Sequence, residues 1–298
     1  MSILNKKSYV IAVSGGPDSM ALLHMYHKYV KAVCTVKYNK RPDCQFDVDC
    51  VKKLCTKYNL QFELLDVTEE MYSSIKENNF QNKARIIRYN FFKDIAKKYN
   101  TNKILVAHHL DDFMETAYMQ QKQSLDLYFY GIREVSKHDD GFEIHRPLIR
   151  KYRKATLERY CNDYDIEYAI DSSNNEDIYE RNRVRKIIST WDSNKVYEFL
   201  KSINKLNKQK HKEYKQVFKT YHDWEKKEFS IKEFKNFSKN LQVSLIYMYL
   251  DNHELHRQSI DKVNGIISFI YGINGKKYRL TDNLYLVKLN QKITIQKE

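Results

Sequence analysis

Two adjacent glycines, placed between a strand pattern and a helix pattern, constrain this chain more than any other feature. They lie in YVIAVSGGPDSMALLH, residues 9–24, of a sequence with only seven glycines in 298 residues. Glycine lets the backbone adopt unusual dihedral angles and approach a ligand closely, and Pro17 suits the first helical turn, where its missing N–H costs nothing. We therefore expect a strand, a tight loop at Gly15 and Gly16, and a helix whose free N–H groups point at an anion.

The loop predicts phosphate as that anion, although it matches neither G-x-G-x-x-G nor the Walker loop, which needs a lysine before Ser or Thr. The Ser14 and Ser19 hydroxyls can add hydrogen bonds, and Asp18 is placed to help hold Mg²⁺. A tight strand-to-helix turn without a ligand would account for Gly-Gly alone. The six residues SGGPDS taken together favour the phosphate site.

Strand and helix patterns alternate from residue 8 to about residue 170. Strands separated by helices predict a mostly parallel sheet covered on both faces, that is, a Rossmann-like α/β domain. The predicted strands are 8–13, 32–36, 61–67, 103–107 and 166–171.

The sequence changes character near residue 194, and we expect a catalytic domain over 1–194 and a smaller, mainly helical domain over 195–298. The second domain begins with a Lys-rich helical pattern at 194–228 and continues with shorter helices at 241–250 and 259–270. It ends in a predicted β-hairpin that turns at Asp282-Asn283. One apolar stripe of the long helix is interpreted as core; the stripe is Tyr214, Val217, Phe218, Tyr221 and Trp224.

Charge and cysteine content narrow the function. The formal net charge of +14, from 52 basic and 38 acidic residues, favours a polyanionic partner such as nucleic acid. The longest apolar runs are far shorter than the roughly 20 residues of a membrane-spanning helix, so we expect a cytoplasmic protein with no membrane segment. Five cysteines contain no C-x-x-C pair and no zinc-ligand spacing.

A second polar motif, AHHLDDFMET at 107–116, follows a predicted strand, where ligands bind in open α/β sheets. With a helix starting near Leu110, His108, Asp112 and Glu115 share a face with Thr116. Carboxylates in such a place bind metal, or hold and deprotonate a cationic amine.

Arginines form a third pattern. Arg85 and Arg88 lie on the basic side of an amphipathic helix over 80–99, and Arg181, Arg183 and Arg185 follow in ERNRVR. The planar guanidinium suits phosphate and base contacts, although solvated or salt-bridged arginines on surface helices give the same pattern.

These motifs together resemble a known family. SGGPDS is similar to the loop of the PP-loop ATP pyrophosphatases. HHLDDFMET, the helix with Arg85 and Arg88, the RPL segment at 146–148, and DSSN followed by RNRVR resemble the tRNA(Ile)-lysidine synthetases, in the family's order and over about two thirds of the chain.

The resemblance implies an ATP-dependent carbon–nitrogen ligase. ATP adenylates the wobble cytidine of tRNA(Ile) with a CAU anticodon, and the ε-amine of free lysine displaces AMP at C2, which changes codon reading from AUG to AUA. ATP and Mg²⁺ are the implied cofactors, and the C-terminal domain is implied to help bind tRNA.

The expected site follows from the motifs and this resemblance. Asp18, Asp112 and Glu115 are catalytic candidates; Asp112 and Glu115 hold lysine, and Asp18 and Asp112 hold the metal. The ATP-binding candidates are Ser14, Gly15, Gly16, Pro17, Asp18 and Ser19. The candidates for tRNA or phosphate are Arg85, Arg88, Arg181, Arg183 and Arg185.

Three alternatives stay open on the sequence. A tRNA thiolase would share the loop, but would need the cysteine pair or iron–sulfur cluster that the spacing does not provide. An amide-forming synthetase of small metabolites has no need of a strongly basic surface. A tRNA-binding module with an inactive ATP site would tolerate loss of Asp18, Asp112 and Glu115, which are all present.

Overall fold

The structure is a computed structural model, and it divides the chain into two compact units. The first unit is formed by 1–126 with 130–203, and the second by 127–129 with 204–298. The predicted boundary at 194/195 lies at the start of the long helix within which this division falls. The described residues are 8–39, 44–75, 79–123, 127–138, 140–169, 180–255, 258–273 and 275–297.

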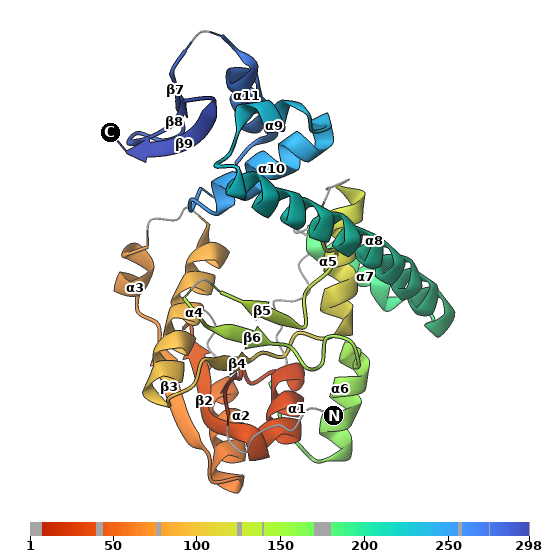
Figure 1. Cartoon of the computed structure of the whole chain (residues 1–298). Helices are drawn as coiled ribbons and strands as arrows, with labels where there is room; N and C mark the ends of the chain where they lie inside the picture. The colour runs from red at the N-terminus through yellow and green to blue at the C-terminus, as the bar shows by residue number, and fades with distance from the viewer. Residues whose placement is uncertain are drawn as a thin grey trace. The chain divides into compact units, whose positions relative to one another are not determined.

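A six-stranded sheet with the order β3-β2-β1-β4-β6-β5 forms the centre of the first unit (Figure 1). All neighbouring strands pair in parallel except β5, which is antiparallel to β6. This confirms the predicted α/β class with a mostly parallel sheet. The strands are β1 (Tyr9–Ala12), β2 (Val30–Lys37), β3 (Gln61–Asp66), β4 (Lys103–Leu105), β5 (Val135–Lys137) and β6 (Glu143–His145).

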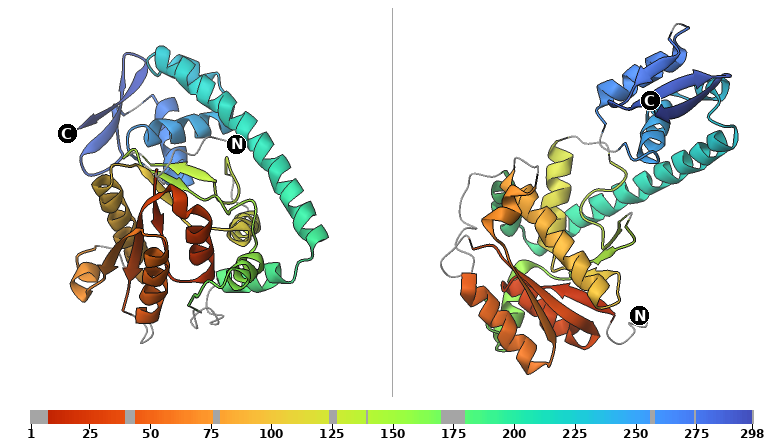
Figure 2. Two further views of the ribbon diagram at one scale, coloured as in Figure 1. Left: turned by 90° about the horizontal axis from the view of Figure 1, so that it is seen from below. Right: turned by 90° about the vertical axis from the view of Figure 1, so that its left-hand side faces the viewer.

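Helices cover both faces of this sheet, as alternation along β1 requires (Figures 1 and 2). Ile11 packs in one core with α1, α2 and α6, whereas Val10 packs in another with α4. Both side chains are fully buried, so β1 reads as a continuous apolar run. These helices are α1 (Pro17–Tyr26), α2 (Cys44–Lys57), α4 (Phe80–Lys98) and α6 (Lys154–Asp163).

The remaining helices of the first unit pack against other helices. Helix α5 packs against α7, and the short α3 packs against α4. A short 3-10 turn, His27–Tyr29, joins α1 to β2. The helices are α3 (Glu69–Ser73), α5 (Leu110–Lys122) and α7 (Glu180–Ser189), followed by the first part of α8 (Ser193–Lys226).

The prediction of a strand at 166–171 is wrong for its described part, 166–169, which belongs to no strand; residues 170 and 171 lie outside the described ranges. The position beside β4 is occupied by β6. The backbone N–H of Ala169 instead donates to the carbonyl of Gly15, at 2.9 Å. The segment therefore braces the glycine loop and does not extend the sheet.

The second unit packs α9, α10 and α11 with the end of α8 and a three-stranded antiparallel sheet. The predicted terminal hairpin is present with one more strand, because a second turn at Asn290 and Gln291, both with positive φ, joins β8 to β9. The elements are α9 (Ile231–Lys235), α10 (Lys239–Asp251), α11 (Ile260–Tyr271), β7 (Lys277–Arg279), β8 (Leu284–Leu289) and β9 (Lys292–Lys297).

The aromatic stripe predicted on the long helix is only partly core. Val217, Tyr221 and Trp224 are buried, and the Trp224 indole N–H donates to the Ser230 carbonyl at 2.9 Å. Tyr214 and Phe218 are 37% and 45% exposed, so the interpretation of these two as core is wrong. Tyr214 and Phe218 are four residues apart and share one face of the helix. This face lies beside the one that Val217, Tyr221 and Trp224 direct to the core.

No helix in the described ranges has both the length and the apolar character needed to span a bilayer.

Candidate active site

The glycine loop, residues 14–19, joins β1 to α1 as the sequence predicts. Gly15 has φ +90°, and a Cβ there would lie 2.8–2.9 Å from backbone and side-chain atoms of Asp47. Gly16 has φ −74°, and among the described residues a Cβ there would meet only the Ser14 hydroxyl, at 3.7 Å. Gly15 is thus required by the fold, whereas Gly16 leaves open space in front of the helix that begins at Pro17.

The two serines hold the shape of this loop. The Ser19 hydroxyl accepts from the backbone N–H of Ser14 at 3.1 Å and donates to the Gly16 carbonyl at 2.9 Å. The Ser14 hydroxyl lies 3.2 Å from the Ser19 hydroxyl. Ser19 is buried and closes the loop on itself, whereas Ser14 is exposed and lines the pocket in front of the loop.

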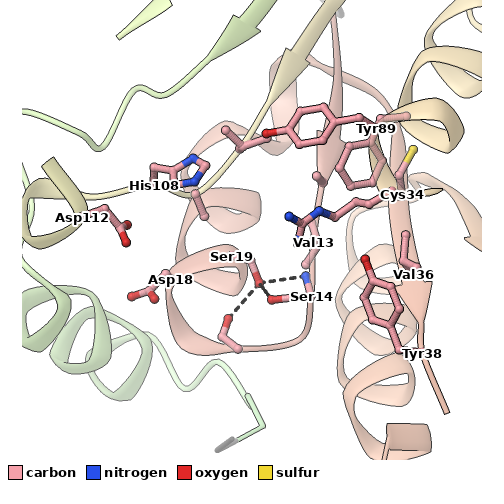
Figure 3. A pocket seen from close by; sticks show the side chains of 16 residues that line it. Val13, Ser14, Asp18, Ser19, Cys34, Val36, Tyr38, Tyr89, His108 and Asp112 are labelled. Atoms are coloured by element: carbon pink, nitrogen blue, oxygen red, sulfur yellow. Dashed lines mark hydrogen bonds between the residues drawn. The ribbon is translucent and has the colours of Figure 1, made fainter. Parts of the chain in front are cut away.

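A pocket of about 270 Å³ opens in front of the glycine loop, and we call it the glycine-loop pocket (Figure 3). Asp18, His108 and Asp112 lie on one side of it. The opposite side is apolar and aromatic, with Arg88 also in the lining. That side contains Cys34, Val36, Tyr38, Tyr89 and Phe92. A polar phosphate end joined to an apolar, aromatic end is the arrangement that a nucleotide requires.

The pKa values of the two histidines of HHLDD are shifted in opposite directions. Burial lowers the pKa of His108 to about 4, and the charges of Arg146 and Arg181 act in the same direction. Burial alone would also lower the pKa of His109, but Asp18 and Asp112 outweigh it and raise that pKa above its ordinary value. The Nε2 of His109 is 3.5 Å from a carboxylate oxygen of each.

The two aspartates of HHLDD have different tasks. Asp111 accepts from the Arg153 Nε at 2.9 Å and from the Lys154 backbone N–H at 2.7 Å, so it anchors the start of α6. Asp112 accepts from the His109 backbone N–H at 2.9 Å and lines the pocket. Burial would raise the pKa of Asp112, but His109 and the surrounding positive groups hold it below the usual value.

Glu115 forms an ion-pair cluster with α7. Its side chain is 1% exposed, and its two oxygens accept from the Nε atoms of Arg181 and Arg185, at 2.9 and 3.0 Å. Arg181 also reaches Asp112 at 3.1 Å. In this state the carboxylate of Glu115 is engaged by arginine, and it directs both guanidinium groups toward the site.

The other predicted arginines separate into two groups. Arg88 lines the glycine-loop pocket and lies 5.8 Å from the Tyr89 ring. Arg85 stacks on the same ring at 4.8 Å but is exposed and outside the pocket lining. Arg183 is exposed on α7, on a different face from Arg181 and Arg185. The structure thus brings three of the five arginines to the site.

A second cavity adjoins the first, and we call it the carboxylate pocket. It has a volume of about 450 Å³ and shares Asp18 and Asp112 with the glycine-loop pocket. Its wall also contains Arg153, Lys154 and Glu158 from the start of α6, none of which the motifs predicted. No sequence motif indicates these residues, because α6 lies far from α5 in the sequence and the two come together only in the folded chain.

The residues also fit a magnesium ion held together with phosphate. In the described part of the chain, no three His, Cys, Asp or Glu side chains form a group that would hold a metal ion. Asp18 Oδ1 is buried and has no hydrogen-bond partner in that part of the chain. Mg²⁺ is commonly bound through one or two carboxylates, with phosphate oxygens and water completing its shell.

Comparison with known proteins agrees with this geometry. Residues 2–190 match the family model described as a PP-loop domain. The chain is 44% identical over 287 residues to the tRNA(Ile)-lysidine synthase of Ureaplasma parvum, covering 95% of this chain and 85% of the relative. It is 40% identical over 292 residues to that of Malacoplasma penetrans, covering 97% and 98%.

Among solved structures, the chain resembles the U34-tRNA thiolase NcsA from Methanococcus maripaludis, with a TM-score of 0.56 and 15% identity. The match covers 70% of this chain and 74% of the thiolase. At this identity the likeness concerns the fold alone.

Proposed function

The chain belongs to the tRNA(Ile)-lysidine synthases, which are ATP-dependent PP-loop ligases, and from this premise we propose the substrates and the residue roles. The substrates are ATP with Mg²⁺, free L-lysine, and tRNA(Ile) with a CAU anticodon. The reaction joins the lysine ε-amine to C2 of the wobble cytidine. The observation that carries the proposal is the pair of pockets that share Asp18 and Asp112.

The glycine-loop pocket is assigned to ATP. The N–H groups at the start of α1 and the Ser14 hydroxyl bind the β- and γ-phosphates, and the adenine lies toward Val36, Tyr38 and Phe92. Asp18 and Asp112 hold Mg²⁺, which neutralises phosphate charge when bound. Arg181 and Arg185, directed by Glu115, stabilise the negative charge that develops on the phosphates.

The first chemical step is adenylation. The C2 oxygen of cytidine attacks the α-phosphorus of ATP, a P–O bond forms, and pyrophosphate leaves. The product carries the adenylyl group on the C2 oxygen and is activated for substitution, because that oxygen can then leave C2 as part of AMP.

The second step places lysine in the carboxylate pocket. Arg153 and Lys154 provide positive charge for its α-carboxylate, and Asp112 with Glu115 provides negative charge for its ε-ammonium. Glu115 accepts from both Arg181 and Arg185, whereas Asp112 accepts from Arg181 alone of these two, so Asp112 is the carboxylate that meets the ammonium first. A protonated amine is no nucleophile, so one proton must leave before nitrogen attacks C2 and AMP departs.

A stepwise assay tests this assignment. The protein is mixed with ATP, Mg²⁺ and a CAU tRNA, and pyrophosphate and AMP are measured before and after lysine is added. We expect tRNA-dependent pyrophosphate release in the first stage and AMP release on lysine addition. Release of AMP with ammonia in place of lysine would instead support an amide-forming synthetase, and a requirement for a sulfur donor would support a thiolase.

Residence in the cytoplasm stays a prediction of the sequence.

A further inference from the structure

An exposed row of aromatic rings runs along the part of α8 that belongs to the second unit. We call it the ring ladder: Tyr128, Tyr214, Phe218 and His222. The consecutive ring centroids are 5.2, 5.9 and 4.4 Å apart, and the rings meet edge to face or tilted. They are not stacked face to face.

The ladder is well exposed for a group of this size. Tyr128 is 36% exposed, Tyr214 37% and Phe218 45%, and the His222 side chain is 43% exposed. Contiguous exposed aromatic rings on a folded protein mark a contact surface more often than chance. Tyr221 and Trp224, on the neighbouring face of the same helix, belong to the core of this unit, and none of the four ladder rings does.

A row of lysines runs beside the ladder. Lys208, Lys212, Lys215 and Lys219 are spaced i, i+4, i+7 and i+11, so they share the helix face next to the rings. All four are exposed, and the described residues give none of them an acidic partner. Residues 205–219 contain six lysines and one glutamate.

Rings and lysines side by side fit one class of partner. Aromatic rings stack on unpaired bases, and lysines neutralise the phosphates that join those bases. A second copy of this chain would bring the same lysines together, and like charges on facing surfaces oppose association. At the C-terminal end of the ladder, Glu225 lies 2.8 Å from the His222 ring nitrogen and limits the basic surface there.

We infer that the ring ladder is an RNA-binding surface, on which Tyr214 and Phe218 stack with unpaired bases of the tRNA while the lysine row binds the adjoining phosphates. This inference rests on the proposed function, since it takes the tRNA substrate as the ligand. The ladder contributes to tRNA affinity and takes no part in the chemical steps.

The test is tRNA binding by the full chain, measured by fluorescence anisotropy with a labelled CAU tRNA. The double variant Tyr214→Leu, Phe218→Leu keeps apolar bulk but removes both rings, and we expect its Kd to rise about 10-fold or more, in keeping with the known size of base stacking. The matched control is Tyr197→Leu, which removes a 63% exposed tyrosine elsewhere on α8 and should leave Kd within about twofold.

Two further variants separate stacking from charge. Phe218→Trp keeps a ring and should retain the wild-type Kd. Lys215→Gln with Lys219→Gln should reduce the slope of log affinity against log salt by roughly two, one for each phosphate contact. Thermal unfolding of each variant shows whether its effect on Kd comes from loss of the fold, and Tyr214→Leu alone is the substitute if the double variant unfolds.

The outcomes distinguish this inference from the proposed function. If the Kd of the double variant for tRNA stays within twofold of wild type, the inference about the ring ladder is wrong, even where lysine transfer proceeds. Ladder variants that bind tRNA weakly, in a protein that transfers no lysine, support the ladder and contradict the function. A ladder substitution that converts a dimer to a monomer without changing tRNA affinity overturns the inference in favour of self-association.

Discussion

Identical neighbouring residues in the glycine loop and in HHLDD have different structural roles, which residue type alone does not predict. Gly15 and Gly16 are adjacent and identical, yet only Gly15 has a positive φ and a crowded Cβ position. Asp111 and Asp112 are adjacent and identical, yet one anchors α6 and the other lines both pockets. The sequence predicts that all four lie near one site, but it does not predict which of them shape the fold and which face the pockets.

The glycine pair gives a direct prediction. Gly15→Ala should lower the free energy of unfolding by about 1–3 kcal/mol, from an unfavourable φ and contact with Asp47. Gly16→Ala should change that free energy by less than about 0.5 kcal/mol but weaken ATP binding at least tenfold, since its methyl group enters the phosphate space. Denaturant unfolding and ATP titration measure the two effects. Equal losses of stability in both variants would contradict the assignment.

The aspartate pair gives a second prediction. Asp112→Asn keeps an oxygen for the His109 N–H but loses the charge, so lysine transfer should fall about 100-fold or more with little change in Tm. Asp111→Asn should lower Tm, because Arg153 loses its ionised partner. Near-wild-type transfer by Asp112→Asn would remove Asp112 from the mechanism.

His108 predicts a pH dependence of stability. Its pKa is about 4 in the folded protein and near 6.5 unfolded, so below pH 6.5 the unfolded chain takes up a proton that the folded chain does not. Wild-type stability should therefore fall, relative to His108→Asn, as pH drops from about 6.5 to 4, by on the order of 1–3 kcal/mol. Chemical denaturation at several pH values measures this, and a difference that does not vary with pH would refute it.

At the level of elements, α5 and α7 meet through one buried carboxylate. Periodicity predicts that Asp112 and Glu115 share a face of α5, and that Arg181 and Arg185 share a face of α7. It does not predict that these two faces contact each other, because the pairing joins residues 66 and 70 positions apart. Without knowledge of this contact, the sequence predicts two separate features, a lysine site on α5 and a phosphate site on α7.

The contact between these helices predicts unequal costs for two substitutions. Glu115→Gln should lower the free energy of unfolding by about 1–3 kcal/mol, a range that allows for the partial exposure of both arginines. Glu180→Gln removes an exposed pair with Lys122 between the same helices and should cost less than about 1 kcal/mol. Urea titrations of the two variants decide this, and equal costs would show that the buried cluster is not a main contact.

The missed elements have physical reasons. β5 and β6 have only three residues each, too few to show alternation, and they flank Gly141 in a short hairpin. The segment 166–169 has the apolar pattern of a buried strand because Ile166 and Ala169 are buried. Ile166 is buried in the core with α1, α2 and α6, and Ala169 bonds to the glycine loop, so neither residue is in the sheet. Burial can be predicted from such a pattern, whereas the hydrogen-bond partner cannot.

For the whole molecule, the strand order brings the two sequence motifs together at one edge of the sheet. β1 and β4 are adjacent in the sheet, although more than 90 residues separate them, and each is followed at its carboxyl end by one of the two motifs. The general rule for parallel sheets predicts that such ends bind ligands, so the sequence predicts a site here without giving the strand order. The carboxylate pocket needed α6, which no motif marks.

The central claim is that this chain joins lysine to a base of tRNA, and incorporation of labelled lysine tests it most directly. Bulk tRNA is incubated with the protein, ATP, Mg²⁺ and labelled lysine, and is then treated with mild alkali, which removes aminoacyl esters but spares a C–N bond. We predict alkali-stable label that maps to a CAU anticodon and is strongly reduced with the Gly16→Ala variant when ATP is below saturation. Alkali-labile label, or no label while pyrophosphate is still released, would contradict the account.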